Sequence, residues 1–268
     1  MIRKLKNWLF NPIIFIQLLL SVIKKKFIPY YERRAEDFFK SKNIYKYFLS
    51  GHNSEVKPNF VDLKNIFELI TSRKPRCVLE FGVGFTTICI CLALKENEKN
   101  GFNGQLYTVD AEKSWLENTE NKLPSELKKY VTFHYSSCSA SIVNNQLVSI
   151  YDNLPNISPN FIYLDGPSPG SVKGKINGLG FTEEKDSNFR GDGIGIVSAE
   201  KDNRWNRRIV ASDILLYESS APYDFFILVD RRYVNCNFLI NNLKFQYKLK
   251  RDLATGIVTF EKKYQPYP

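Results

Sequence analysis

One short stretch of the chain combines a carboxylate, two glycines and a hydroxyl at a spacing that can build a ligand pocket. Glu80 ends an apolar run and is followed by Gly82, Gly84 and Thr86. Glycine lets the backbone turn sharply and approach a ligand closely, because no Cβ stands in the way. The next strand-like run ends at Asp110, where a carboxylate can accept hydrogen bonds from both hydroxyls of a ribose. The pattern predicts a nucleoside site.

Two further acids, Asp165 and Asp230, end apolar runs later in the chain. The carboxyl ends of parallel strands meet at one edge of a sheet, so we expect both acids at that edge. Asp165 is the candidate catalytic residue, a base that could take the proton of a hydroxyl acceptor. His134 and His52 are alternative bases, although an alternating strand usually places a residue such as His134 on a structural face.

A parallel sheet is needed to bring these residues together, and the remaining sequence predicts one. From Cys77 onward strand-like and helix-like runs alternate, which is typical of an α/β sheet with helices on both faces. The last two strands are joined by too few residues for a crossover helix, so they should pair antiparallel. We predict a Rossmann-like, seven-stranded, mostly parallel sheet with a terminal antiparallel hairpin. The predicted strands are 77–81, 105–110, 131–135, 160–165, 224–230, 245–250 and 257–262, and the predicted helices are 86–97 (capped by Thr86 or Thr87), 113–122, 139–146, 209–218 and 235–243.

With these motifs, the chain from about 57 to 262 resembles the class I S-adenosylmethionine-dependent methyltransferases. The resemblance implies methyl transfer as the activity and S-adenosylmethionine as the cofactor. It also implies that Glu80 organises the amino-acid end of the cofactor, that the glycine turn passes beneath it, and that Asp110 binds its ribose. The turn after the third strand would contact the adenine. The full set of expected cofactor contacts is Glu80, Gly82, Gly84, Thr86, Asp110, Ser137, Cys138 and Asp165.

A nicotinamide dinucleotide fold is the main alternative for this pattern. Such a fold prefers a third glycine, which packs the helix closely beside a pyrophosphate. Thr87 occupies that position here. Because S-adenosylmethionine carries no phosphate, Thr87 favours the methyltransferase over a dehydrogenase.

The ends of the fourth and fifth strands partly resemble those of catechol-type O-methyltransferases. That resemblance implies that Asp165, Asp230 and a following asparagine would hold a divalent metal. Arg231 stands in place of the asparagine, and a guanidinium there would repel a cation or substitute for it. A divalent metal is therefore disfavoured, and we assign no metal ligand.

A short likeness to methyltransferases of polysaccharide sugars rests on Leu-Asp-Gly-Pro at 164–167 and Val-Asp-Arg at 229–231. It implies O-methylation of a sugar, glycan or other small acceptor. Basic side chains near 201–208 could hold a carboxylate or phosphate of that acceptor while an indole stacks on a sugar face; a solvated helix start is the alternative. The candidate substrate-binding residues are Arg204, Trp205, Arg207, Asp230 and Arg231.

The segment 166–200 holds eight of the fourteen glycines and exceeds the usual length of a connection. We predict a lid or substrate loop, with a surface insertion without function as the alternative. It interrupts a methyltransferase domain that we place at 41–268.

Most of the net charge of +10 belongs to the N-terminal part, since residues 1–50 hold 11 Lys/Arg against 3 Asp/Glu. A nearly neutral body disfavours nucleic acid as a partner. We predict residues 1–40 as a basic, apolar helical extension. Its run 8–23 is shorter than the ~20 apolar residues of a membrane span, and lysines flank it. Peripheral attachment to an anionic membrane surface is expected, with packing against protein as the alternative.

The five cysteines form no Cys-x-x-Cys pair, which indicates a reducing, cytoplasmic compartment. Two other functions stay open for this sequence: a catalytically inactive, membrane-attached binding protein on the same fold, and a nucleic-acid methyltransferase. The residues name neither the acceptor nor the oligomeric state.

Overall fold

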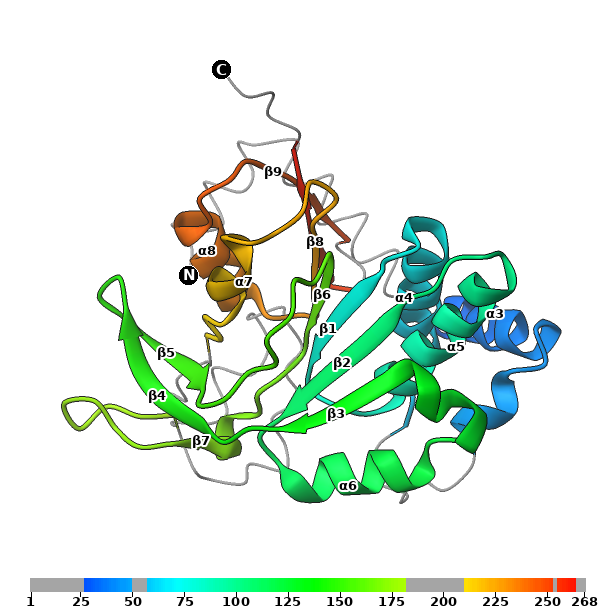
Figure 1. Cartoon of the computed structure of the whole chain (residues 1–268), viewed down its shortest axis with the longest axis horizontal. Coiled ribbons are helices and arrows are strands. Elements are labelled where there is room, and N and C mark those ends of the chain that lie inside the picture. Colours follow the sequence, from blue (N-terminus) through cyan, green and yellow to red (C-terminus); the bar gives the residue numbers. More distant parts are fainter. Residues whose placement is uncertain (1–26, 50–56, 182–209, 253–254, 264–268) are drawn as a thin grey trace, which may run out of the picture.

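The computed structural model describes residues 27–49, 57–181, 210–252 and 255–263. Its main sheet has seven strands in the order β3-β2-β1-β6-β8-β10-β9 (Figure 1). Strands β3 through β8 in that order pair parallel, whereas β10 runs antiparallel to both β8 and β9. The predicted Rossmann-like sheet with its terminal hairpin is confirmed. The strands are β1 (Cys77–Phe81), β2 (Gln105–Asp110), β3 (Val131–Tyr135), β6 (Phe161–Leu164), β8 (Phe226–Val229), β9 (Tyr247–Arg251) and β10 (Val258–Lys262).

Helices cover both faces of the sheet because the central strands are apolar on both sides. Successive side chains of a strand point to opposite faces. In β1, Val78 therefore packs with α4 (Phe60–Arg73) and α5 (Phe85–Lys99), while Leu79 packs with α7 (Ile214–Glu218) and α8 (Tyr233–Asn242). Figure 1 shows these two groups on opposite sides of the strands. A further helix, α6 (Lys113–Lys122), connects β2 to the short 3-10 helix η2 (Ser125–Tyr130).

The predicted helix at 139–146 is wrong. This segment belongs to a hairpin of β4 (Cys138–Val143) and β5 (Gln146–Tyr151), which forms a second sheet with β7 (Val172–Lys173). The turn between β4 and β5 consists of Asn144 and Asn145, both with positive φ (47° and 61°). Asparagine tolerates this conformation, and two such residues form the tight turn that matches the twist of a hairpin. The turn chemistry thus prevails over the weak helical pattern.

The helix expected from 209 begins only at Ile214. Residues just before it run alongside β5, where the Ser149 N–H donates to the Val210 carbonyl over 2.8 Å. The Asn235 side chain holds Ala211 on both sides, accepting from its N–H over 2.7 Å and donating to its carbonyl over 3.1 Å. These contacts keep 210–212 extended. The other predicted helices agree with α5, α6 and α8 to within two residues.

The described N-terminal part consists of α3 (Ile28–Ser41) and the short 3-10 helix η1 (Tyr45–Phe48). Phe39 of α3 is fully buried, with its ring centroid 4.9 Å from that of Phe48 and 6.1 Å from that of Phe67 on α4. Helix α3 is thus packed into the core that α4 and α5 share. Within the described ranges, none of the helices combines the length and hydropathy needed to cross a bilayer.

Two of the expectations fall largely outside the described residues. The run 8–23 of the N-terminal extension lies there, as does the second half of the 166–200 insertion. The described first half of the insertion contains the short 3-10 helix η3 (Pro169–Ser171) and β7, which pairs with β4.

Candidate active site

The Glu80 carboxylate is fully buried beneath the turn from β1 to α5 and accepts three hydrogen bonds there. The donors are the hydroxyls of Thr86 (2.5 Å), Thr87 (2.6 Å) and Thr108 (2.8 Å). Burial raises the pKa of Glu80 to about 7, although the three hydroxyls favour its charged form. Both oxygens are thus engaged in joining β1, β2 and the start of α5. Glu80 positions the turn from below.

Helix α5 begins after Gly84, which is its N-cap, so the expected cap by Thr86 or Thr87 is wrong. Both threonines lie in the first turn and donate to Glu80. The Thr87 hydroxyl also accepts from the Gly84 N–H over 3.1 Å. The carboxylate below the helix explains why these hydroxyls point inward.

At the middle of the sheet, Gly82 and Gly166 bring two backbones into contact. Gly82 has a φ of +95°, and a Cβ added there would lie 2.9 Å from the Gly166 nitrogen. A Cβ added at Gly166 would lie 2.7 Å from the Gly82 nitrogen. These glycines follow β1 and β6, the neighbouring strands at which the strand order reverses direction. In open α/β sheets, ligands bind at the carboxyl ends of the strands at this reversal.

Asp110 joins the same turn from the end of β2. One carboxylate oxygen accepts from the Val83 N–H over 2.9 Å and the other from the Glu112 N–H over 2.7 Å. The Gly82 N–H donates to the Val109 carbonyl over 2.9 Å. The glycine turn and Asp110, predicted to share one edge of the sheet, therefore lie side by side. Burial raises the pKa of Asp110, and the bonds from Glu112 and Val83 oppose that shift.

The turn after β3 holds two expected cofactor residues, and only one of them is partly exposed. Ser137 is half-buried, and its hydroxyl donates to an Asp152 carboxylate oxygen over 2.5 Å. Cys138, by contrast, is fully buried in the core between the sheet and the β4–β5 hairpin. The side chain of Cys138 thus packs away from solvent, as a buried free cysteine usually does.

The candidate base Asp165 follows β6, and its side chain is 47% exposed. Partial burial at the strand ends and then the like charge of Asp230 raise its pKa, while Arg232 and Arg231 oppose the shift. The Arg232 guanidinium donates to the Asp165 carbonyl and, over 3.1 Å from each of two nitrogens, to the Pro167 carbonyl. Arg232 therefore fixes the turn that carries Asp165.

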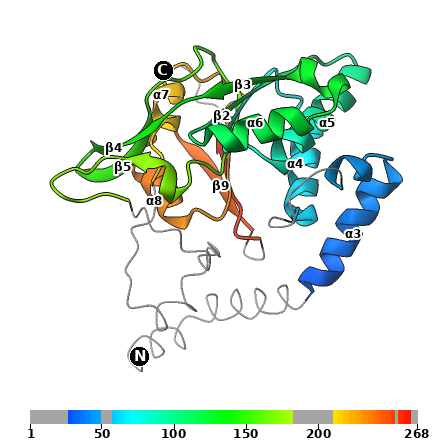
Figure 2. The same cartoon turned by 90° about the horizontal axis from the view of Figure 1, so that it is seen from below.

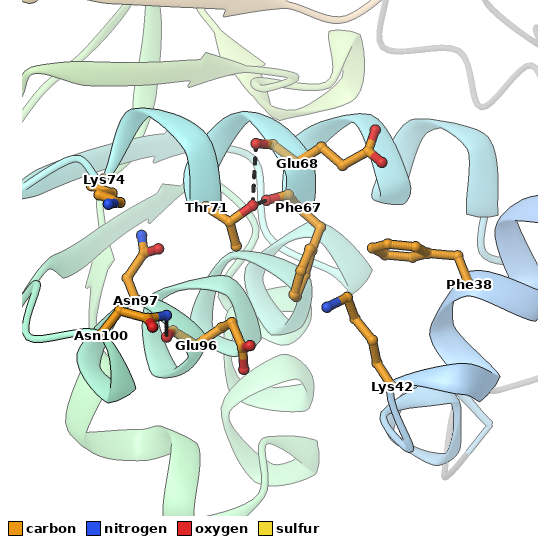
Figure 3. Close-up of a pocket in the computed structure, with 9 residues that line it drawn as sticks. All are labelled: Phe38, Lys42, Phe67, Glu68, Thr71, Lys74, Glu96, Asn97 and Asn100. Atoms are coloured by element: carbon orange, nitrogen blue, oxygen red, sulfur yellow. Dashed lines mark hydrogen bonds between the residues drawn. The ribbon is translucent and has the colours of Figure 1, made fainter.

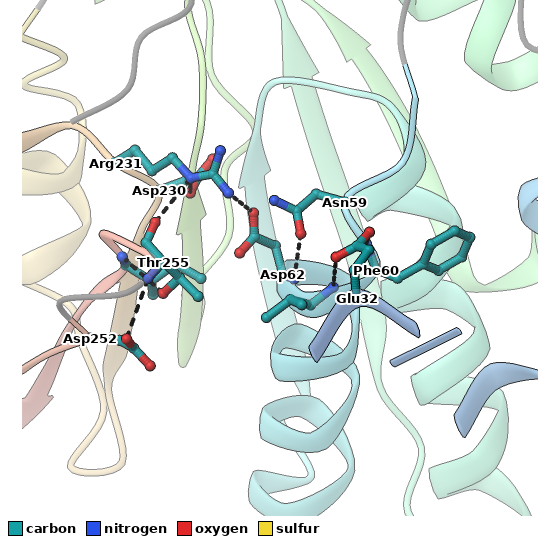
Figure 4. Close-up of polar contacts among 10 residues, drawn as sticks. Glu32, Asn59, Phe60, Asp62, Asp230, Arg231, Asp252 and Thr255 are labelled. Atoms are coloured by element: carbon teal, nitrogen blue, oxygen red, sulfur yellow. Dashed lines mark hydrogen bonds and ion pairs between the residues drawn. The ribbon is translucent and has the colours of Figure 1, made fainter. Parts of the chain in front are cut away.

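Asp230 follows β8 and lies beside Arg231, whose Nε is 3.6 Å from Asp230 Oδ1 (Figure 4). Arg231 also donates to the Thr255 carbonyl over 3.0 Å and to the Asp62 carboxylate in the first turn of α4. Burial is the main cause that raises the pKa of Asp62 to about 7, and Arg231 opposes it. Arg231, expected as a substrate ligand, directs its charge toward two carboxylates of the protein.

This arrangement does not fit a divalent metal. A metal bound between Asp165 and Asp230 would lie beside the Arg231 guanidinium, which already neutralises Asp230 and Asp62. Across the residues that the structure describes, no group of three His, Cys, Asp or Glu side chains is placed to hold an ion. The guanidinium occupies the electrostatic role that a cation would have.

Of five further candidates, the structure describes only His134. His134 on β3 is hydrogen-bonded through Nε2 to the Asn153 carbonyl over 3.1 Å, which is a structural contact. Arg204, Trp205, Arg207 and His52 lie outside the described residues.

Sequence reasoning missed Arg232 and Asp62. The sequence shows that Arg231 and Arg232 both follow the strand. It does not show which of them faces the β6 turn, because that depends on the positive φ of Arg231 (46°). Asp62 is three residues after Asn59, whose side chain accepts from the Asp62 N–H over 3.1 Å and caps α4. That helix-start pattern was the available signal for placing Asp62 at the site edge.

A surface pocket of about 460 Å³ lies elsewhere, between α3 and the last turns of α4 and α5 (Figure 3). Its walls include Lys42, whose ammonium lies 5.5 Å from the Phe67 ring centroid, and Asn97, whose amide donates to the Ile70 carbonyl over 2.9 Å. Both α4 and α5 end there, so this pocket is at the opposite edge of the sheet from Gly82 and Asp110.

No protein-family model and no curated protein matches the chain. Among solved structures, it is similar to the S-adenosylhomocysteine-bound methyltransferase PaMTH1 of Podospora anserina, with 11% identity, a TM-score of 0.41 and coverage of 78% of this chain and 81% of that one. It is also similar to the O-methyltransferase of Bacillus cereus in complex with S-adenosylhomocysteine, with 10% identity, a TM-score of 0.40 and coverage of 87% and 90%. TomG, an O-methyltransferase of Streptomyces achromogenes, matches with 11% identity, a TM-score of 0.39 and coverage of 87% and 90%.

Proposed function

We propose that the protein is an S-adenosylmethionine-dependent methyltransferase that methylates an oxygen of a sugar, glycan or other small acceptor. The observation that supports this most is the junction of the Gly82 turn with Asp110 at the reversal of the strand order. A backbone without Cβ atoms permits close approach of the cofactor, and a carboxylate beside it can accept from ribose hydroxyls. The buried Glu80 holds this turn in place.

Methyl transfer mainly requires that the enzyme align the acceptor oxygen with the methyl group. The sulfonium of the cofactor supplies an activated methyl group, and holding two reactants in line can be worth about 7–11 kcal/mol. Asp165, next to the Gly82 turn, is the base that we propose for the acceptor hydroxyl, a role worth about 10²- to 10⁴-fold in rate. Its raised pKa brings its proton affinity closer to neutral pH, where a base is most effective.

A hydroxyl acceptor suits the groups that surround Asp165. Asp230 places a second carboxylate near Asp165, and its side chain is 17% exposed. A carboxylate can accept from a second hydroxyl of a polyol. The guanidinium groups of Arg231 and Arg232 already bind oxygens of the protein itself, those of Asp62 and Asp165. An anionic group of the acceptor would therefore depend on Arg204 and Arg207, with Trp205 stacking on a sugar face.

Calorimetric titration with S-adenosylhomocysteine tests the cofactor assignment. We expect the full-length protein to bind it and Asp110→Ala to weaken binding at least tenfold, since charged hydrogen bonds are worth about 1.5–3 kcal/mol each. Asp37→Ala, which removes an exposed carboxylate of α3, is the matched control and should bind as the unmodified protein does. Undetectable binding to the folded protein, or equal binding by Asp110→Ala, would contradict the proposal.

An acceptor panel separates the remaining functions. Methyl transfer to a sugar hydroxyl supports the enzyme, whereas cofactor binding without turnover on any acceptor favours a binding protein that has lost catalysis. Strongly salt-dependent RNA or DNA binding, together with methylation of that nucleic acid, would favour a nucleic-acid methyltransferase.

A further inference from the structure

The first turn of α3 holds four large apolar side chains in solvent. Phe27, Ile28, Tyr30 and Tyr31 are 49%, 42%, 53% and 47% exposed, and we call them the α3 turn. Further along, the same helix is anchored by the fully buried Phe39. Figure 2 shows the start of α3 standing away from the sheet. Single exposed apolar residues are ordinary, but a contiguous group of this kind marks an interaction surface.

Basic residues accompany the α3 turn. Arg33 and Arg34 are exposed, and Arg34 donates to the Tyr30 hydroxyl over 3.0 Å. In the sequence, Lys24, Lys25 and Lys26 directly precede the turn. The nearby acid Glu32 is directed inward, since its two carboxylate oxygens accept from the Phe60 and Val61 N–H groups over 2.6 and 3.1 Å. The exposed charge next to the aromatic side chains is therefore mainly positive.

A second basic group lies at the end of the edge strand β9. Lys250 and Arg251 are exposed, Leu249 beside them is 48% exposed, and the Arg251 guanidinium lies 5.2 Å from the ring centroid of the exposed Tyr233. We call Leu249, Lys250, Arg251 and Tyr233 the β9 end. Lysines on an edge strand also prevent strand-to-strand association, so their presence alone has a structural explanation.

A line of contacts runs from Glu32, which follows the α3 turn, to Thr255, which lies just beyond the β9 end (Figure 4). Glu32, the residue after the α3 turn, holds the start of α4. Asp62 in that start pairs with Arg231 at the end of β8, and Arg231 in turn donates to Thr255 in the turn that follows β9. The α3 turn and the β9 end thus flank the edge of the sheet that carries Asp230.

We propose that this edge, formed by the α3 turn and the β9 end, binds an anionic lipid bilayer. Aromatic side chains settle at the headgroup level of a membrane, and basic side chains are drawn to anionic headgroups. The candidate site would then open toward the bilayer, where an acceptor carried on a membrane lipid could reach it. This consequence for the acceptor rests on the proposed function, whereas the binding surface itself does not.

Flotation of the full-length protein with vesicles tests the surface. Vesicles of phosphatidylcholine alone are compared with vesicles that also contain phosphatidylglycerol. We expect binding to the anionic vesicles only, and a loss of about fivefold per removed charge in Arg33→Gln/Arg34→Gln and in Lys250→Gln/Arg251→Gln. Tyr30→Ser/Tyr31→Ser should weaken binding as well.

The matched controls lie at the opposite edge of the sheet, where β1, β2 and β3 begin. Arg76→Gln/Lys128→Gln removes two exposed charges, and Phe102→Ser removes a side chain that is 45% exposed. Both should float like the unmodified protein. S-adenosylhomocysteine binding, measured on every variant, should stay unchanged, which separates loss of the surface from loss of the fold or the cofactor site.

Three results would overturn the proposal. The first is equal flotation with neutral and anionic vesicles, or none with either. The second is flotation that Lys24→Gln/Lys25→Gln/Lys26→Gln abolishes while the α3 and β9 variants bind normally, because the attachment would then lie in the preceding segment alone. The third is equal loss in the controls at the opposite edge of the sheet, which would indicate unspecific attraction.

Discussion

Arg231 and Asp62 form an ion pair that ties the end of β8 to the first turn of α4. Asp62 is buried, and one of its carboxylate oxygens has no hydrogen-bond partner; the same is true of one oxygen of Asp230. The Arg231 guanidinium therefore lies between two carboxylates, and the charge of Arg232 also acts on Asp230. The left-handed backbone of Arg231 (φ +46°) directs it between them. Arg231 acts as a positioning residue for the edge that carries Asp230.

The first prediction concerns this pair. Arg231→Gln should lower the free energy of unfolding by about 1–3 kcal/mol, because it leaves buried carboxylates without a counter-charge. Asp62→Asn should cost less, since the amide oxygen can still accept from Arg231. The double variant should be more stable than the sum of the single effects implies, by at least about 0.5 kcal/mol. Urea denaturation of the four proteins measures the cycle, and strict additivity would show that the pair is not coupled.

A second prediction addresses the contact of Gly82 with Gly166. Gly82→Ala forces a Cβ to within 2.9 Å of backbone atoms at a φ of +95°. We expect a loss of at least about 1–2 kcal/mol in stability and weaker S-adenosylhomocysteine binding. Gly170→Ala is the matched control, because no atom lies within 4 Å of its added Cβ. Equal thermal stability of the two variants would mean that the close approach imposes no constraint.

The third prediction tests how Arg232 acts on Asp165. The positive charge of Arg232 lowers the pKa of Asp165, so Arg232→Gln should raise that pKa further. If Asp165 is the base, the acidic limb of kcat/KM against pH moves to higher pH, by on the order of half a unit to one unit. Arg232→Lys keeps the charge and should shift the limb less. Arg76→Gln, at the start of β1 and exposed, serves as the control. If the acidic limb of kcat/KM stays at the same pH in Arg232→Gln, Asp165 is not the group whose titration produces that limb.

The main sheet and the acids at its edge could be predicted from the sequence because each depends on local pattern. Continuous apolar runs such as that of β8 specify buried parallel strands, and Asp110 and Asp165 follow such runs directly. Adjacency in the sheet then brings them to one edge without further information. Gly82 was predictable for a similar reason, since its turn must leave the strand sharply.

What the sequence did not reveal depends on contacts between distant segments. Asp62 reaches Arg231 only because α4 starts at the carboxyl edge of the sheet. Cys138 was expected at the cofactor, but alternation along β4 places it in the core. The β4–β5 hairpin was missed although Asn144-Asn145 is a recognisable hairpin turn.

The last prediction uses Asp213, a buried acid at the start of α7. Its Oδ1 accepts from the Tyr151 N–H over 2.9 Å, while Oδ2 has no hydrogen-bond partner. Burial raises the pKa of Asp213 to about 7, against about 3.9 in an unfolded chain. Between these values the folded state binds the proton more tightly than the unfolded state does. The contribution of Asp213 to stability therefore falls as pH rises from about 4 to 7, and stays low above that.

Asp213→Asn keeps an acceptor for the Tyr151 N–H but cannot titrate. The stability of the unmodified protein relative to this variant should decline by on the order of a few kcal/mol between pH 5 and pH 8, as measured by urea denaturation at both values. Asp37→Asn, at an exposed position, should show a constant difference over the same range. A pH-independent difference for Asp213→Asn would mean that Asp213 stays ionised in the folded protein. Its unpartnered oxygen would then need a cationic or hydrogen-bonding neighbour, since an ionised carboxylate is not stable in a dry core without one.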